Sequence, residues 1–445
     1  MELSDTNDEA ASEQGPLALR SRSRTIFNRE RQNSERHTTD PSPSSLRIVT
    51  RRESHKSPFF EFMRAVFLPQ LIMPTYDHGF IERFASQSLG EAFRFPYFMD
   101  ALLACSGSEI MISDDFHRNL AEMYYFKALR GLRTHLSGAS VSHRPEIQVL
   151  RTILLLCMYE KSRINCSDEV LLHLAGAAAL VKSLCHQIEA VTPSRMAEEE
   201  YSTSLVILEA FIFHATTCIP FHGLSYPSLP INDTFQFAFR ILQRHLPGAK
   251  EDGFLQFRIL GAPPALFAQV RQVALLHRRF EAHYGYDSQQ CLELEQDLGQ
   301  WNDDIFDKCP QYDIGSMQDN TLSASSRSPS NLTHDHPRGS GPRLYVLAAR
   351  IILRHMITAL EQTTQLPYAT APSLHDMIYE AIVLVVGIDI SKPFFADYFC
   401  WPFFYLGICL SRQHHRDLLM DKINSFPGNG PMGRVAVMLK AKWEC

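Results

Sequence analysis

Cysteine is missing from the first hundred residues of this 445-residue chain, whose ten cysteines begin at Cys105 and stand singly from there to Cys445. A disulfide framework or a zinc site usually shows as closely spaced, paired cysteines, and this sequence has no such pairs. The chain also does not start with a basic segment and an apolar run of the secretory type. We therefore expect reduced thiols in an intracellular protein.

The sequence also lacks the short motifs that most enzymes carry. It has no G-x-S-x-G elbow, no G-x-x-x-x-G-K-[ST] phosphate loop, no G-x-G-x-x-G turn after a strand and no H-E-x-x-H pair. We therefore predict no catalytic, cofactor-binding or metal-binding residues, no cofactor, and a protein that is not an enzyme. No run reaches the roughly 18 apolar residues of a membrane helix, so no membrane partner is expected.

Segments with strand periodicity are scarce, whereas helical periodicity begins at Phe59 and continues to the end. Between Phe116 and Leu136, apolar residues recur every fourth position in the row Leu120, Tyr124, Ala128, Leu132 and Leu136. This spacing predicts a core-facing helix. Further helices are predicted at 146–161, 169–184, 202–217, 264–284, 289–301, 343–361, 373–386 and 393–412. The fold class is therefore all-α.

Two segments interrupt the helical pattern. Residues 1–56 are rich in Ser, Arg, Glu and Pro and contain almost no large apolar residues, so we predict a disordered tail. Residues 311–342 are dominated by Ser, Asn, Asp, Gly, Pro and His, and we predict a flexible loop there. Residues 57–445 should then form one large helical domain that this loop interrupts.

Charge is unevenly distributed in the tail, although the whole chain has a net charge of −6. Five acidic residues come first, and the stretch from Arg20 to Lys56 then holds ten basic and four acidic residues, a net charge of +6. The arginines can bind phosphate or act as a nuclear-import signal, and the alternative is a merely solvated linker. The residues predicted for this role are Arg20, Arg22, Arg24, Arg51 and Arg52.

Aromatic residues are crowded into two segments, one from Phe394 to Tyr405 and one that holds Phe211, Phe213 and Phe221. The simpler interpretation is core packing, and the alternative is an apolar pocket for a small molecule. His173, which precedes small residues, is interpreted in the same way, as a packing histidine or as a polar contact to a ligand.

Several motifs follow one another in an order that resembles the helical regulatory region of fungal zinc-cluster transcription factors. They lie at Pro96–Ser106, Tyr124–Leu132, Leu154–Glu160, His173–Leu180, Glu209–His214, Trp401–Gly407 and Trp443. The resemblance implies effector sensing, partner binding and control of transcription in the nucleus, without catalysis. In that family DNA is read by an N-terminal C-x2-C-x6-C cluster that holds two zinc ions, and this sequence has no such motif.

We accordingly expect a nuclear transcriptional regulator that acts with a DNA-binding partner, touches DNA only indirectly or weakly through its basic tail, and responds to a small apolar effector. Either the protein naturally lacks the zinc cluster or an upstream exon is absent, and the start at Met1 with an acidic run favours the first. By analogy with cluster-less regulators, its targets would be biosynthetic genes of secondary metabolism. The alternatives are a helical enzyme of secondary metabolism with an aromatic-lined pocket, or a helical-repeat scaffold.

Overall fold

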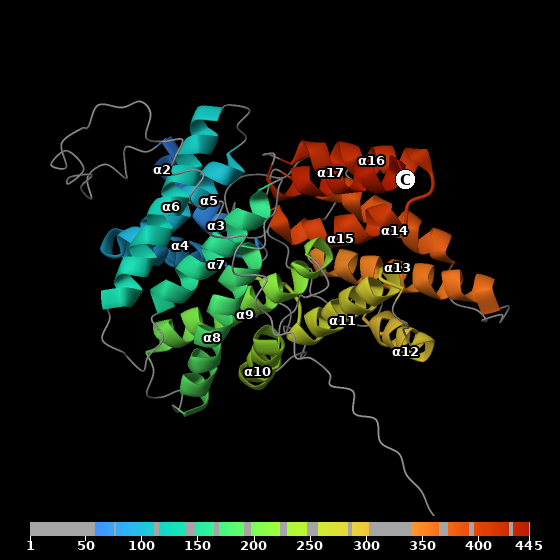
Figure 1. The fold of residues 1–445 in the computed structure, drawn as a ribbon, viewed down its shortest axis with the longest axis horizontal. Coiled ribbons are helices and arrows are strands. Elements are labelled where there is room, and N and C mark those ends of the chain that lie inside the picture. Colours follow the sequence, from blue (N-terminus) through green and yellow to red (C-terminus); the bar gives the residue numbers. More distant parts are fainter. Residues whose placement is uncertain are drawn as a thin grey trace, which may run out of the picture. The chain divides into compact units, whose positions relative to one another are not determined.

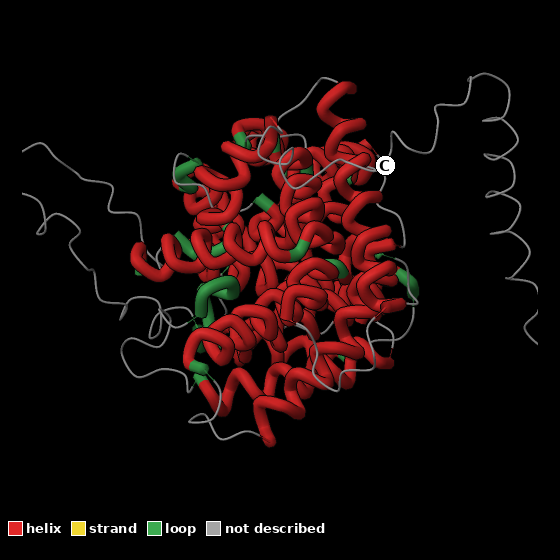
Figure 2. The backbone as a smooth tube through the Cα atoms, turned by 90° about the vertical axis from the view of Figure 1, so that its left-hand side faces the viewer, coloured by secondary structure: helices red, strands yellow, loops and turns green. Residues whose placement is uncertain are grey.

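α-Helices make up nearly all of the computed structural model, which describes residues 58–74, 77–110, 115–138, 147–163, 169–190, 197–222, 229–246, 257–283, 287–301, 340–364, 373–390, 396–426 and 430–444. Figure 2 shows the described backbone as helices joined by short loops, and no strand is assigned within these ranges. The prediction of an all-α fold is confirmed. The segments at 205–207 and 383–386, which are rich in the β-branched residues typical of strands, lie inside helices.

The helices are, in chain order, α2 (Pro58–Phe62), the π-helix η2 (Met63–Phe67), α3 (Leu68–Gln70), α4 (His78–Arg94), α5 (Pro96–Glu109), α6 (Asp115–Gly138), α7 (Ile147–Ser162), α8 (Glu169–Ala190), α9 (Glu198–Thr217), the 3₁₀-helix η4 (Ile219–Phe221), α10 (Leu229–His245), α11 (Pro264–Glu281), α12 (Ser288–Gly299), α13 (Ser340–Thr364), α14 (Leu374–Gly387), α15 (Asp397–Ile408), α16 (Gln413–Ser425) and α17 (Pro431–Glu444).

The predicted tail at 1–56 and most of the predicted loop at 311–342 lie outside the described residues. The end of that loop was predicted wrongly, because α13 begins at Ser340 rather than at Arg343. The predicted helical stripe of α6 is confirmed at Tyr124, Ala128 and Leu132, which are buried, but Leu136 is 50% exposed near the end of the helix.

Contacts divide the helices of the Ser54–Cys445 unit into two groups. In the first, α5 packs on α6 and α7, and α8 packs on α7 and α10; in the second, α13 packs on α11, α12, α14 and α15, and α15 packs on α17. The groups correspond to the blue-to-green and yellow-to-red helices of Figure 1. Helix α9 lies between them and contacts α7, α8, α10 and α11.

Helix α9 is buried almost all round, with every residue from Thr203 to Thr217 buried except Ala210. A helix that is apolar on all sides is expected to lie in a core. Its exposed N-terminal turn holds Glu198, Glu199 and Glu200, whose negative charges are favourable beside the positive end of the helix dipole.

Helix α8 has a predominantly apolar composition. Over 18 residues its mean hydropathy reaches 1.2, which makes α8 the one helix of the described chain with the length and composition of a membrane span. No uninterrupted run of 18 apolar residues occurs in α8, as expected, because His173, Lys182 and His186 interrupt it. Its buried side contacts α7, α9 and α10, and Thr234 on α10 donates a hydrogen bond to the carbonyl of Ala178 at 3.2 Å. These contacts are those of a core helix.

Candidate functional site

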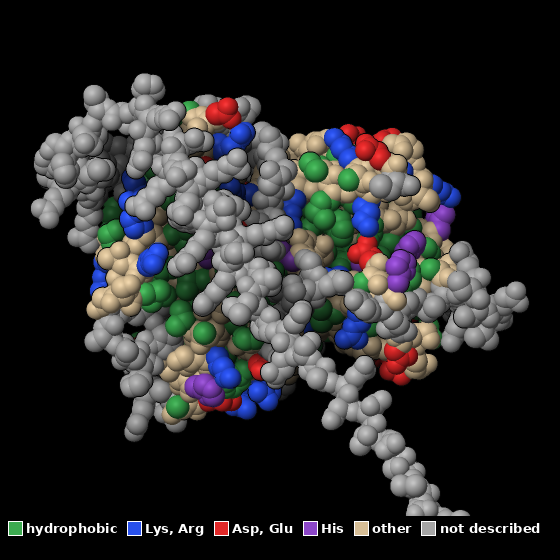
Figure 3. Space-filling model, viewed as in Figure 1, with side chains coloured by type: hydrophobic (Ala, Val, Ile, Leu, Met, Phe, Trp, Pro, Cys, Tyr) green, Lys and Arg blue, Asp and Glu red, His purple; other side chains and the backbone are tan. Residues whose placement is uncertain are grey.

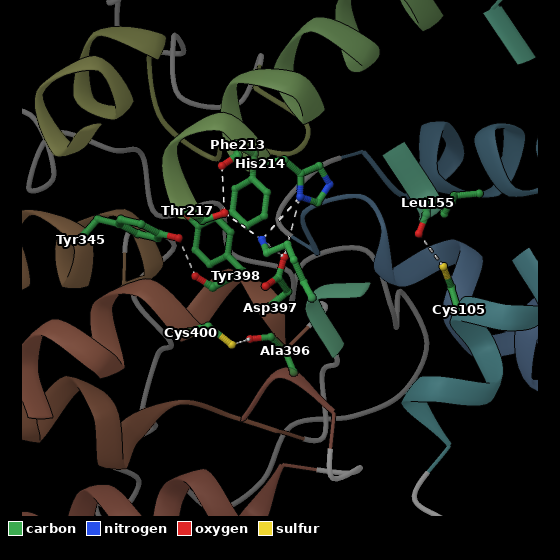
Figure 4. Close-up of polar contacts among 11 residues, drawn as sticks. Cys105, Leu155, Phe213, His214, Thr217, Tyr345, Ala396, Asp397, Tyr398 and Cys400 are labelled. Carbon is green, nitrogen blue, oxygen red and sulfur yellow. Dashed lines mark hydrogen bonds and ion pairs between the residues drawn. The ribbon is translucent and has the colours of Figure 1, made fainter. Parts of the chain in front are cut away.

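Three helices that are distant in sequence meet at a buried group of polar side chains. Lys161 on α7 places its Nζ 2.5 Å from Oδ2 of Asp397 on α15, and donates to Oγ1 of Thr217 on α9 at 2.9 Å. Nδ1 of His214, also on α9, lies 3.5 Å from the same ammonium and 4.0 Å from the carboxylate. Figure 4 shows Thr217, His214 and Asp397 converging on one point. We call these four residues the buried ion cluster.

Burial and charge act in opposite directions on this cluster. Burial alone would lower the pKa of Lys161, but Asp397, Cys218 and Cys157 together outweigh it and the pKa is raised to about 12. Burial raises the pKa of Asp397, and the Lys161 ammonium opposes that rise. The pKa of His214 is lowered well below its ordinary value, mainly by burial and also by repulsion from the Lys161 ammonium. The contact of 2.5 Å between Lys161 and Asp397 is that of an ion pair, and the His214 imidazole beside it is neutral at pH 7.

The cluster has a second acidic neighbour on α5. Burial, and then repulsion from Asp397, raise the pKa of Glu109 to about 8. Because this value exceeds neutral pH, Glu109 keeps its proton in the folded chain. The site thus avoids placing a second negative charge beside Asp397.

His214 also lines an apolar cavity of about 80 Å³ between α4, α5, α7 and α9. The walls are mostly aliphatic and aromatic, and the three polar residues among them are Arg151, Thr203 and His214. The apolar lining is made by Leu71, Phe84, Phe98, Leu102, Leu154, Leu155, Met158, Val206, Ile207, Ala210, Phe213 and Ile259. A mainly apolar cavity with a few polar groups is the usual form of a small-molecule site.

Arg151 carries the positive charge of this cavity. Its guanidinium lies 4.6 Å from the ring centroid of Phe98 and 5.3 Å from that of Phe84, so it is held between two aromatic residues. It donates to Oγ of Ser88, and to Oε1 of Gln148 at 3.4 Å. Burial lowers the pKa of Arg151 to about 10, and the Glu91 charge partly opposes this, so the group remains charged at neutral pH.

One wall of the cavity is a turn that contains Ile259. The backbone N–H groups of Ile259 and Leu260 donate to Oε2 of Glu209 at 2.8 and 3.2 Å. Tyr398 on α15 donates to the carbonyl of Leu260 at 2.9 Å. Gly261 follows with a φ of +63°, a left-handed conformation that glycine adopts without strain. The turn is therefore fixed by side chains from α9 and α15.

The aromatic segment does not form the pocket that was considered as an alternative. Trp401 and Tyr405 are completely buried, and the Trp401 ring stacks on Tyr345 with centroids 5.4 Å apart. Of the aromatic residues proposed, Phe213 lines the cavity and the described part of the α15 segment is core. Phe394 and Phe395 lie outside the described residues.

The sequence-predicted site residues and the cavity residues are different sets. Arg20, Arg22, Arg24, Arg51 and Arg52 all lie outside the described residues, so their phosphate-binding or import role stays a prediction. His173 has a protein partner, because its Nε2 lies 3.0 Å from Oη of Tyr125. No group of three potential metal ligands occurs among the residues that the structure covers.

Lys161, Asp397 and Arg151 were not found from the sequence. Lys161 and Asp397 are 236 positions apart, and no local pattern pairs them. Arg151 could have been noticed, because it is the only charged residue between Val149 and Met158, where all other residues except Thr152 are apolar. A lone charge on a core-facing helix face is a signal that a search for motifs overlooks.

The comparison with family models gives one finding. The fungal specific transcription factor domain matches residues 57–444, which is most of the chain. The chain belongs to the fungal specific transcription factor domain family. Its members are transcriptional regulators, and the suspected resemblance is thereby confirmed. Comparison with curated proteins and with solved structures found no match.

The family-like motifs of this fungal specific transcription factor domain have structural roles. Pro402 has no N–H, so the carbonyl of Tyr398 four residues earlier lacks its helical donor, and Tyr345 supplies one at 2.6 Å. Trp443 donates through Nε1 to the carbonyl of Gly407 at 2.9 Å, near the end of α15. A Cβ at Gly407 would lie 2.6 Å from the terminal methyl groups of Leu439, so a larger residue there would displace the Leu439 side chain between α15 and α17.

Proposed function

We propose that this chain is a nuclear, non-enzymatic regulator of transcription that works with a DNA-binding partner and senses a small apolar effector. The family match over residues 57–444 carries this proposal. The cavity supports the effector, because it combines apolar walls with Arg151 and His214 in the middle of a helical domain. By analogy, we propose that the target genes belong to a biosynthetic cluster of secondary metabolism.

A DNA-binding partner is proposed because the C-x2-C-x6-C zinc motif does not occur in these 445 residues. The basic residues Arg20, Arg22, Arg24, Arg51 and Arg52 can add nonspecific phosphate contacts or direct nuclear import, but phosphate contacts do not select a DNA sequence. Sequence selection would then come from the partner. The partner we propose is a transcription factor that presents an amphipathic helix.

Helix α14 offers a surface for such a helix. On this helix Tyr379, Val383 and Val386 are 61%, 52% and 50% exposed. Their spacing of four and three residues places them in one stripe with the period of a coiled-coil seam. Figure 3 shows green apolar side chains reaching the surface among charged ones over the C-terminal helices. Burying this stripe against a partner helix would remove apolar surface from water.

The proposal is tested by chromatin occupancy of the tagged protein in its own organism. Full-length protein is compared with a deletion of residues 1–56 and with a Val383→Asp/Val386→Asp variant. Val437→Asp on α17 is the matched control, since Val437 is 53% exposed and lies outside the stripe. We expect occupancy at discrete promoters, loss of occupancy in the double variant and retention in the control.

Each comparison also addresses one part of the proposal. If only the tail deletion lowers occupancy, the tail rather than α14 recruits the protein, and the α14 surface is rejected. A protein that stays outside the nucleus with no occupancy in any form would reject the regulator. Occupied promoters spread over unrelated genes would reject the biosynthetic cluster as the target.

A further inference from the structure

The strongest unassigned feature of the described chain is the charge of Arg151 in the apolar cavity. No carboxylate forms an ion pair with Arg151 within the described ranges. Glu91, the acidic residue that acts on its pKa, is held instead by Arg94 at 3.0 Å and by Gln148 at 3.3 Å. Arg151 is partly buried, and a charge withdrawn from water without an ionic partner is costly and is normally compensated in native proteins. The unmatched charge therefore points to an anion that the cavity receives.

The guanidinium of Arg151 has further hydrogen-bond donors that could bind such an anion. It has five N–H donors, and the hydrogen bonds to Ser88 and Gln148 engage two of them. Stacking on Phe84 and Phe98 restricts its orientation. A planar, pre-oriented guanidinium is well suited to bind a carboxylate through two parallel hydrogen bonds.

The remaining walls define the rest of the ligand. Leu102, Leu154, Val206, Ile207 and Phe213 offer no hydrogen-bonding side chain, so they would contact an apolar body. The cavity of about 80 Å³ is roughly half the volume of a dry protein cavity that holds benzene, about 150 Å³. A short branched aliphatic body fits this space best, with Met158 as the wall side chain most able to adjust.

We propose that the cavity binds a small apolar monocarboxylic acid, with its carboxylate on Arg151 and its apolar body between α5, α7 and α9. This deepens, and rests on, the effector role proposed above. A neutral ligand would leave the charge of Arg151 uncompensated, and a dianion would bury a second negative charge without a cationic partner in the wall. The ligand should thus carry a single negative charge.

The test is binding of two short branched acids, 2-methylpropanoate and 3-methylbutanoate, to the purified full chain by calorimetry, compared with their neutral amides. We expect each acid to bind at least about tenfold more tightly than its amide, in line with a charge-assisted pair. Arg151→Gln should remove this preference and Arg151→Lys should retain part of it. Arg118→Gln, which changes an exposed arginine on α6, should bind as the unaltered chain does.

Equal affinity for acid and amide in the unaltered protein would overturn the proposal, and so would an unchanged preference in Arg151→Gln. The comparison on the unaltered protein stands even where Arg151→Gln fails to fold. Absence of binding by both acids at millimolar concentration also rejects this ligand class. Because binding is measured on purified protein, its failure is separable from that of the regulator proposal, which chromatin occupancy decides.

Discussion

Breaking the Lys161–Asp397 pair should destabilise the domain by far more than breaking an exposed pair. Both side chains are almost fully buried, with 2% and 1% exposed, and their charged atoms are 2.5 Å apart. With an effective dielectric constant of about 20, their attraction at this distance is roughly 7 kcal/mol, most of which offsets the loss of hydration. Removing one partner leaves the other charge buried and uncompensated, which costs about 3–5 kcal/mol.

The measurement is a double-mutant cycle in urea with Lys161→Met, Asp397→Asn and both together. Each single change should lower the free energy of unfolding by about 3–5 kcal/mol. The double variant should be less destabilised than the sum, by about 2–3 kcal/mol, because neither charge is then left alone. The exposed pair Arg118–Asp115, with atoms 2.9 Å apart, is the control and should contribute less than about 1 kcal/mol.

The cycle can refute this reasoning in two ways. Additive single effects would mean that the two side chains do not interact in the folded protein. Single effects as small as those of the Arg118–Asp115 control would mean that water reaches the pair. Hydrogen exchange adds an independent readout, since Lys161 belongs to α7 and Asp397 to α15, and losing the pair should weaken protection of both helices.

Three further predictions concern stability. The pKa of Glu109 is raised from an ordinary 4.5 to about 8. Between these pH values the folded chain keeps a proton that the unfolded chain loses. The free energy of unfolding should therefore fall as the pH rises from 4.5 to about 8. Glu109→Gln should flatten that part of a urea-denaturation pH profile. Gly261→Ala should cost about 1–2 kcal/mol because φ is +63°, and shortening Met73 in the same chain should not restore stability if backbone strain is the cause. Ser373→Ala should cost about 1 kcal/mol in the same assay, because Ser373 Oγ caps α14 by accepting from the N–H of Asp376 at 3.1 Å.

Local pattern was enough to predict the helices, because helical periodicity depends on residues three and four positions apart. It placed the start of α11 at Pro264 and the buried row of α6 at Tyr124, Ala128 and Leu132. The local pattern could not show that α15 belongs to the core rather than to a cavity wall, because a segment rich in aromatic residues is expected to be buried in either case. The pairing of Lys161 with Asp397 depends on how α7 and α15 are brought together, and that is a property of the whole packing.

The cavity and the buried ion cluster share a residue, and this gives an effector a physical route to both helix groups. His214 lines the cavity on one side and lies 3.5 Å from Lys161 on the other. Lys161 in turn holds Asp397, the first residue of α15, in the second group. A ligand that favours one position of His214 would alter the surroundings of that ion pair. By linkage, any partner that favours one packing of α15 would change ligand affinity by the same factor.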